Sequence, residues 1–168
     1  MKIIKSLLGK HLFKLKKLFF YKTHLEYSGP YESWDIASEN SVGYDSNLVL
    51  EKIKKSTFEV LENKKIYERD GRSFSEKPLN NTLIKTLEQI GIRGKTILDF
   101  GGSLGSNYIN YRDFFSNYFK KYYIIEQKEV CNLGREVASK YNLPINYVEN
   151  LYEINEKIDI VLFSSSLQ

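Results

Sequence analysis

The sequence contains one cysteine, Cys131, and two histidines, His11 and His24, among its 168 residues. A lone cysteine cannot form an internal disulfide, which excludes the disulfide framework of small secreted proteins and fits a reducing compartment. The chain offers no matching set of ligands for a zinc site, so we expect no metal and histidines at the surface. Cys131 is expected to pack inside a helix.

Long apolar runs are also missing from the sequence. No stretch approaches the ~20 apolar residues that a membrane-spanning helix needs. The apolar residues near the N-terminus are interrupted by lysines too often for a secretory signal. The chain is long enough for one domain, and its 27% charged and 42% hydrophobic residues are typical of globular proteins. We therefore expect a cytoplasmic protein.

The basic residues are concentrated at the N-terminus. The net charge is +4, and the first 22 residues contain seven lysines and no acid. The remainder is close to neutral, so a nucleic-acid partner is not predicted. Residues 2–22 have apolar side chains at helical spacing and predict a basic amphipathic helix. Two interpretations stay open: the helix touches the inner face of a membrane or a partner, or it packs on the domain.

The distribution of apolar residues and turn signals along the sequence divides the chain into three regions. They are a leader helix (1–27), a cap region of helices and loops (28–95) and a third region (96–168). The cap region is predicted to contain a turn-rich stretch (28–46), a helix (47–62), a polar connection with a turn at Asp70-Gly71 (63–78) and a helix closed by Gly91 (79–90).

The third region alternates between strands and helices. The predicted strands are 96–100, 122–126, 145–148 and 158–163, and the predicted helices are 106–118 and 128–141. This alternation indicates an α/β fold with a parallel sheet of about four strands, preceded by helices. The sequence stops just after the last apolar strand, whereas such sheets usually continue. We therefore expect a truncated chain and an incomplete domain.

A glycine-rich turn follows the first of these strands, in ILDFGGSLGS (97–106). Gly101, Gly102 and Gly105 allow a tight turn and a close approach of the backbone to a ligand. The helix that follows presents free N–H groups. Asp99 precedes the turn, where a carboxylate would repel a pyrophosphate and could hold a cationic amino group. The segment therefore predicts a cofactor site.

The residues of the turn discriminate between cofactors. Ser103 and Ser106 stand where a dinucleotide fingerprint requires glycine, and no Lys-Ser or Lys-Thr follows as in a P-loop. S-adenosylmethionine carries an ammonium, a sulfonium and no phosphate, so Asp99 favours it over a dinucleotide. An NAD-dependent enzyme is the less favoured functional alternative. A further alternative is that the glycine turn is purely structural and binds no cofactor.

Polar residues also follow the later strands. Glu126 ends the second strand, 27 residues after Asp99, and could accept both ribose hydroxyls. After the third strand, Glu149 and Asn150 are candidates for an adenine contact. Ser164 and Ser165 end the fourth strand, beside the expected cofactor. Ordinary strand-end polar residues are the alternative for these later positions.

Candidates for catalysis lie upstream, in the polar connection. YERDG (67–71) is dense in ionisable groups within a predicted loop, where functional residues concentrate. Tyr67, Arg69 and Asp70 are the candidates, and a solvated turn with an internal Arg-Asp pair is the alternative. Tyr31 and Trp34 could form an aromatic wall for a sugar or the adenine, or could anchor their loop to the core.

Several of these segments together resemble a family of class I methyltransferases, which occur in bacteria and are often encoded among genes for cell-surface polysaccharides. The similar segments are GPYESWDIA (29–37), GYD (43–45), YERDG (67–71), LDFGGSLGSNY (98–108), IIEQ (124–127) and DIVLFSSSLQ (159–168). The resemblance implies a Rossmann-like class I fold with S-adenosylmethionine bound by Asp99, Gly101, Gly102, Gly105 and Glu126. It also implies that the upstream region covers the cofactor or the acceptor.

The expected function is therefore methyl transfer from S-adenosylmethionine to a glycan or related small acceptor in surface-polysaccharide biosynthesis. Members of that family continue past the fourth strand, and this sequence does not. A truncated non-catalytic remnant, or a binding module that retains the cofactor fold, is the second hypothesis. Neither the acceptor nor the oligomeric state can be read from the residues.

Overall fold

A computed structural model of the protein describes residues 30–40, 47–78, 81–115 and 118–164. The chain divides into two units, Met1–Val42 and Gly43–Gln168. In the first unit, α2 (Trp34–Glu39) begins after Ser33, whose hydroxyl accepts a hydrogen bond from the Ile36 N–H. The predicted helix 2–22 and both histidines lie outside the described residues.

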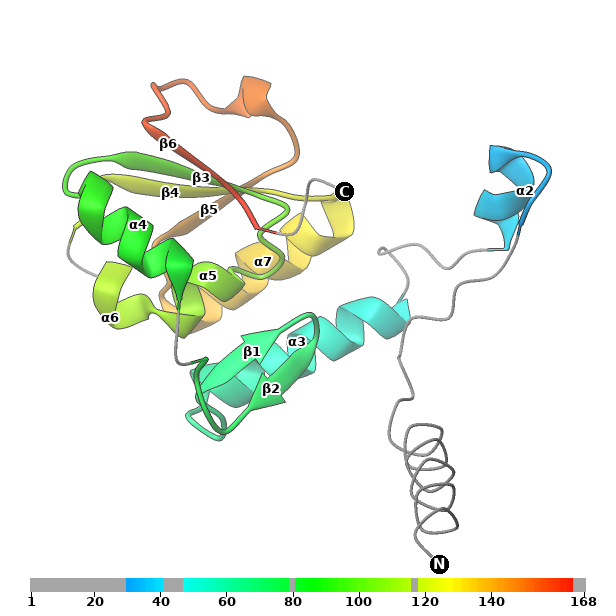
Figure 1. The fold of residues 1–168 in the computed structure, drawn as a ribbon, viewed down its shortest axis with the longest axis horizontal. Helices are drawn as coiled ribbons and strands as arrows, with labels where there is room; N and C mark the ends of the chain where they lie inside the picture. The colour runs from blue at the N-terminus through cyan, green and yellow to red at the C-terminus, as the bar shows by residue number, and fades with distance from the viewer. Residues whose placement is uncertain (1–29, 41–46, 79–80, 116–117, 165–168) are drawn as a thin grey trace, which may run out of the picture. The chain divides into compact units, whose positions relative to one another are not determined.

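The second unit is built on a parallel sheet of four strands (Figure 1). The strands are β3 (Thr96–Phe100), β4 (Lys121–Ile125), β5 (Ile145–Val148) and β6 (Ile160–Phe163), in the order β5-β4-β3-β6. All four lie within two residues of their predicted bounds, which confirms the predicted α/β class and parallel sheet. The chain runs outward from β3 to β5 and then returns to the other side of β3. Open α/β sheets bind ligands at the carboxyl ends of the strands where the order reverses in this way.

Helices of the second unit cover one face of the sheet. They are α3 (Asn47–Leu61), α4 (Thr82–Ile90), α5 (Ser106–Asn110), α6 (Arg112–Phe115) and α7 (Lys128–Tyr141). Strand residues alternate between faces, and Ile97, Tyr122 and Ile124 bury their side chains against this layer. Because Asp99 lies two residues after Ile97, its carboxyl also points into this core.

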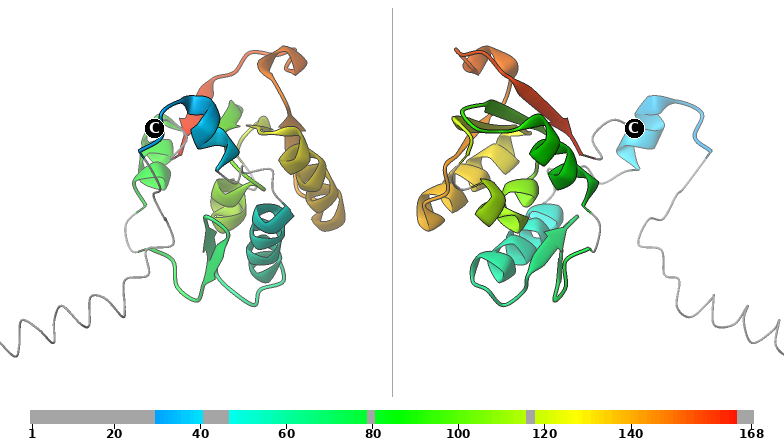
Figure 2. Two further views of the ribbon diagram at one scale, coloured as in Figure 1. Left: turned by 90° about the vertical axis from the view of Figure 1, so that its right-hand side faces the viewer. Right: turned by 60° about the vertical axis from the view of Figure 1, so that its left-hand side comes forward.

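The opposite face of the sheet has a smaller core. It consists of Leu98, Tyr123, Ile125 and Val148, with Ile154 and Ile158 packed against them. The last two belong to the connection between β5 and β6, which includes the 3-10 helix η1 (Leu151–Glu153). Figure 2 shows this connection in orange on one side of the sheet, with α5 and α7 on the other.

A β-hairpin replaces the loop that the sequence predicted at 63–78. Strands β1 (Tyr67–Arg69) and β2 (Arg72–Phe74) pair antiparallel. The predicted turn at Asp70-Gly71 is confirmed. Both residues have positive φ, +52° and +70°, as the two-residue turns of hairpins require. Strands of three residues are too short to show a period in the sequence. Both strands lie against α3, and β1 also lies against α5.

The sequence predicted one helix over 106–118, and this extent is wrong. The structure has two shorter helices instead: α5 ends at Asn110, Tyr111 has a φ of −128°, and α6 begins at Arg112. The helix predicted at 79–90 begins at Thr82, with the Asn81 side chain accepting from the Ile84 N–H, and residues 79 and 80 are not described. Of the helices that the structure describes, none is long and apolar enough to cross a membrane.

Candidate functional site

The glycine turn between β3 and α5 is a tight left-handed loop at the carboxyl end of the sheet. Gly101, Ser103 and Gly105 have φ of +69°, +53° and +93°. Left-handed φ is uncommon for a serine, so the loop holds Ser103 in a conformation that favours glycine. The Gly101 N–H donates to the Ile125 carbonyl at 3.0 Å, and the Gly105 N–H to the Gly102 carbonyl, also at 3.0 Å. The first bond ties the turn to the end of β4.

The turn lies directly on the core beneath it. A Cβ at Gly102 would stand 2.7 Å from the Asp99 carboxyl carbon, and one at Gly105 would stand 2.8 Å from a methyl group of Ile145. Neither position can carry a larger side chain without displacing its neighbour. Glycine at 102 is therefore required by close packing, and at 105 by both packing and φ.

Asp99 is fully buried beneath this turn. Its Oδ2 accepts from the Tyr122 hydroxyl at 2.9 Å and from the Asn107 side-chain amide at 3.0 Å. Its Oδ1 is buried and has no hydrogen-bond partner. Burial raises the pKa of Asp99 to about 6, against hydrogen bonds from Asn107 and Tyr122 that lower it. The sequence suggested that Asp99 holds an ammonium group directly; here Gly102 covers it, so its carboxyl is not exposed at the surface of the turn.

Glu126 reaches the turn from the neighbouring strand. It follows β4 directly and is half-buried; its Oε1 accepts from the Ser103 N–H at 2.9 Å and its Oε2 from the Gln127 N–H at 3.1 Å. Each carboxylate oxygen can accept more than one hydrogen bond, so the group can bind further donors while it holds the turn. The structure thus brings together two predicted parts of the cofactor site: the glycine turn and Glu126, which lies 27 residues after Asp99 in the sequence.

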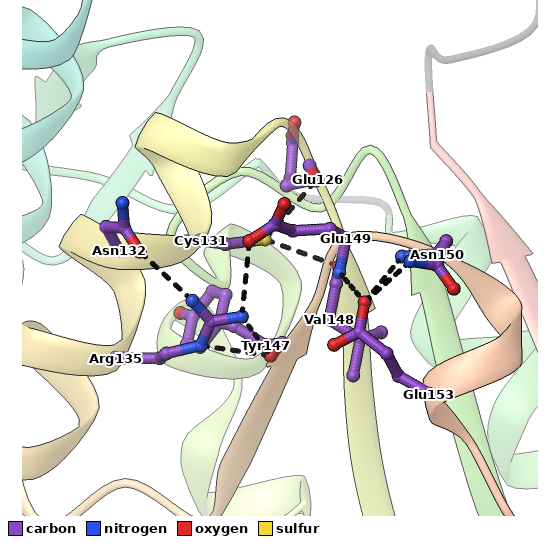
Figure 3. A network of polar contacts seen from close by, with 9 residues as sticks. All are labelled: Glu126, Cys131, Asn132, Arg135, Tyr147, Val148, Glu149, Asn150 and Glu153. Atoms are coloured by element: carbon purple, nitrogen blue, oxygen red, sulfur yellow. Dashed lines mark hydrogen bonds and ion pairs between the residues drawn. The ribbon is translucent and has the colours of Figure 1, made fainter.

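The carboxyl end of β5 carries a second polar network (Figure 3). Arg135 of α7 donates to the Tyr147 carbonyl through Nε at 3.3 Å and Nη2 at 3.1 Å, and lies 3.9 Å from the Glu149 carboxylate. Asn150 forms a capping box with Glu153 at the start of η1. Glu149 is exposed and remains available to a ligand, whereas the Asn150 side chain is used in the cap.

Cys131 lies at the centre of the same region. It is buried, as predicted, and its Sγ donates toward the carbonyls of Glu126 and Val148 at 3.2 and 3.3 Å. These contacts connect α7 to the ends of β4 and β5. Of the other predicted strand-end residues, Ser164 is exposed after β6, and Ser165 lies outside the described residues.

The upstream candidates are distributed over the hairpin. Tyr67 is half-buried and its ring packs against Phe74 and Tyr111, with centroids 6.0 and 6.3 Å apart. Arg69 and Asp70 are exposed, and their side chains form an ion pair at 3.5 Å. This is the internal pair of a solvated turn that the sequence offered as the alternative. In the first unit, Trp34 is 84% exposed.

Sequence reasoning missed the residue of YERDG that is closest to the turn. Glu68 is 2% exposed, and its carboxyl accepts a hydrogen bond from the Ser56 hydroxyl. Burial raises the pKa of Glu68, and the nearby Ser106 side chain acts against this rise. Ser106 is the first residue after the turn. In the structure, alternation along β1 places Glu68 opposite to Tyr67 and Arg69. A strand of three residues is too short to show this alternation in the sequence, so Glu68 was overlooked.

No protein-family model, curated protein or solved structure matches the chain. Among the described residues, no group of three histidine, cysteine, aspartate or glutamate side chains is arranged to hold a metal ion.

Proposed function

We propose that this chain binds S-adenosylmethionine at the carboxyl ends of β3 and β4 and is the cofactor-binding part of a Rossmann-like class I methyltransferase. The observation that carries the proposal is the turn itself. Its backbone lies directly over a buried carboxyl, and a carboxylate from the next strand joins it through Ser103. The reversal of strand order beside β3 provides the usual place for such a ligand.

The residues present fit this cofactor better than a dinucleotide. Asp99 lies beneath the turn with an unpartnered oxygen, so negative charge is concentrated where a dinucleotide would place its pyrophosphate. A ligand with an ammonium and a sulfonium gains from the same charge. In the proposed site, Gly101 to Gly105 contact the amino-acid end, Glu126 accepts from the ribose hydroxyls and Glu149 lies toward the adenine.

The chemistry that such a cofactor supplies is a methyl group already activated on a positively charged sulfur. Alignment of donor and acceptor can then contribute roughly 7–11 kcal/mol, whereas a general base typically adds 10²–10⁴-fold. The rigid turn and the sheet beneath it are suited to holding the donor. We propose a glycan or related small molecule as the acceptor. The second hypothesis for the function is a module that binds the cofactor without turnover.

Calorimetric titration with S-adenosylhomocysteine tests the proposal. We expect saturable binding to the wild-type chain, stronger than any binding of NAD. Replacing Glu126 by glutamine removes a charged acceptor of the ribose hydroxyls and is expected to weaken binding about tenfold or more, because a hydrogen bond to a charged group contributes ~1.5–3 kcal/mol.

The matched control for this experiment is Glu129→Gln, three residues further along. Glu129 is exposed in the first turn of α7, so its substitution changes the net charge equally and should leave affinity unchanged. Absence of heat with the folded wild-type chain, or tighter binding of NAD, would contradict the proposal.

A further inference from the structure

Two acids are buried on either side of the first turn of α5. Glu68 of the hairpin is 2% exposed and Asp99 of β3 is fully buried. The side chain of Asn107 donates to Asp99, and its neighbour Ser106 lies near enough to Glu68 to lower the pKa of that carboxyl against the effect of burial. Consecutive residues at the end of the glycine turn therefore lie beside two carboxyls that come from separate parts of the chain.

Neither buried carboxyl is neutralised by a cation. Glu68 Oε1 and Asp99 Oδ1 have no hydrogen-bond partner, and no described lysine or arginine forms an ion pair with either group. Burial raises the pKa of both. By contrast, the half-buried Glu156 of the same unit binds both Lys120 and Lys121. Burying a carboxylate without a cation is costly, so the pairing is the reverse of what stability alone favours.

The position of Glu68 is fixed relative to the turn. Its backbone N–H donates to Asn110 Oδ1 at 2.9 Å, and Asn110 Nδ2 donates to the Glu68 carbonyl at 2.7 Å. Both bonds are buried and join β1 to the last residue of α5. These bonds fix the main chain of Glu68 beside α5, while burial and the hydrogen bond from the Ser56 hydroxyl keep its carboxyl in the interior.

We propose that Glu68 is an electrostatic specificity residue of the cofactor site, which together with Asp99 selects a ligand that carries an ammonium and a sulfonium near the glycine turn. This inference rests on the proposed function. A buried charge acts over a few ångströms in a medium of low dielectric constant, so Glu68 attracts the ammonium and sulfonium without direct contact. The same field disfavours a phosphate at the turn.

A series of three ligands with a decreasing number of positive groups tests this role. S-adenosylmethionine carries a sulfonium, an ammonium and a carboxylate. S-adenosylhomocysteine lacks the sulfonium charge and keeps the zwitterionic amino-acid end, and methylthioadenosine lacks that end altogether. For Glu68→Gln, which retains an acceptor for the Ser56 hydroxyl, we expect S-adenosylmethionine to bind about 10- to 100-fold more weakly. The loss should be smaller for S-adenosylhomocysteine and negligible for methylthioadenosine.

Two further variants make the result specific. Glu68→Asp keeps the negative charge and should keep the wild-type order of affinities. Glu59→Gln is the matched control, since Glu59 of α3 also binds the hairpin, through the Ser73 hydroxyl, but does so away from the turn. We expect Glu59→Gln to leave all three affinities unchanged.

An equal loss for all three ligands in Glu68→Gln would show a merely structural role and overturn the inference, as would unchanged affinity for S-adenosylmethionine. If Glu68→Gln does not fold, the Glu68→Asp variant provides the test. Loss of the wild-type order of the three ligand affinities in Glu68→Asp would contradict an effect of charge. Failure of the wild-type chain to bind any of the three would instead contradict the proposed function, and it would be seen before any variant is made.

Discussion

Replacing Gly134 by alanine is expected to lower the free energy of unfolding by about 3 kcal/mol, although alanine ordinarily stabilises a helix interior by ~1 kcal/mol relative to glycine. A Cβ at this position in α7 would lie 2.3 to 2.6 Å from three ring carbons of Tyr147. The ring belongs to β5 and is buried, so it cannot swing aside as a flexible side chain would. Thermal unfolding should show a midpoint lower by roughly 6–12 °C.

A double-mutant cycle isolates this contact. In a Tyr147→Val background the ring is absent, and Gly134→Ala should then be neutral or stabilising. Ser139→Ala, at an exposed position of the same helix, controls for helix propensity and should change stability little. A loss in Gly134→Ala that persists without the Tyr147 ring would contradict the packing explanation.

Replacing Asp99 by asparagine is expected to stabilise the free protein at neutral pH while it weakens cofactor binding. Folding raises the pKa of Asp99 from 3.8 to about 6. A raised pKa means that Asp99 favours the folded state fully below pH 4 and loses this contribution as pH rises to about 6. The difference corresponds to about 3 kcal/mol. Asparagine has no proton to lose, so the variant should be more stable above pH 6 by up to that amount.

Denaturant titrations between pH 4 and 8 measure this effect. The free energy of unfolding of the wild-type chain should fall relative to that of Asp99→Asn across pH 4 to 6, and the two should converge at the acid end. Asp159→Asn is the control. Its carboxylate accepts from the Thr96 N–H at 3.0 Å, which lowers the pKa of Asp159, so the corresponding loss of stability occurs as pH falls. An Asp99→Asn variant that is less stable throughout would contradict a buried, uncompensated charge.

The sheet could be predicted from the sequence because its strands are short apolar runs separated by turn signals. Strands 96–100 and 145–148 and the helix 128–141 were predicted to the residue. Glycines and acids placed after such strands converge at one edge of a parallel sheet, and the contact between Ser103 and Glu126 follows from that rule. Local patterns therefore predicted the strands, the parallel sheet and the contact of the glycine turn with Glu126, but not the order of the strands.

Features that depend on contacts between distant segments could not be predicted in this way. The hairpin is stabilised by α3 and by the exchange of two hydrogen bonds with Asn110, 42 residues further along. The same pairing lies where the predicted helix 106–118 breaks. The requirement for Gly134 arises from the Tyr147 ring on another element. No periodicity in the sequence reports these partners, and so Glu68 was passed over.

The central claim is that S-adenosylmethionine binds at the glycine turn, and chemical-shift mapping of backbone amides tests it most directly. On addition of S-adenosylhomocysteine we expect the largest changes at residues 101–106 and at Glu126 and Gln127. A hollow of about 530 Å³ is lined by Arg135, Asn142 and Asn146 among others, and by none of residues 101–106. Changes confined to that hollow, or no change at saturating ligand, would contradict the account.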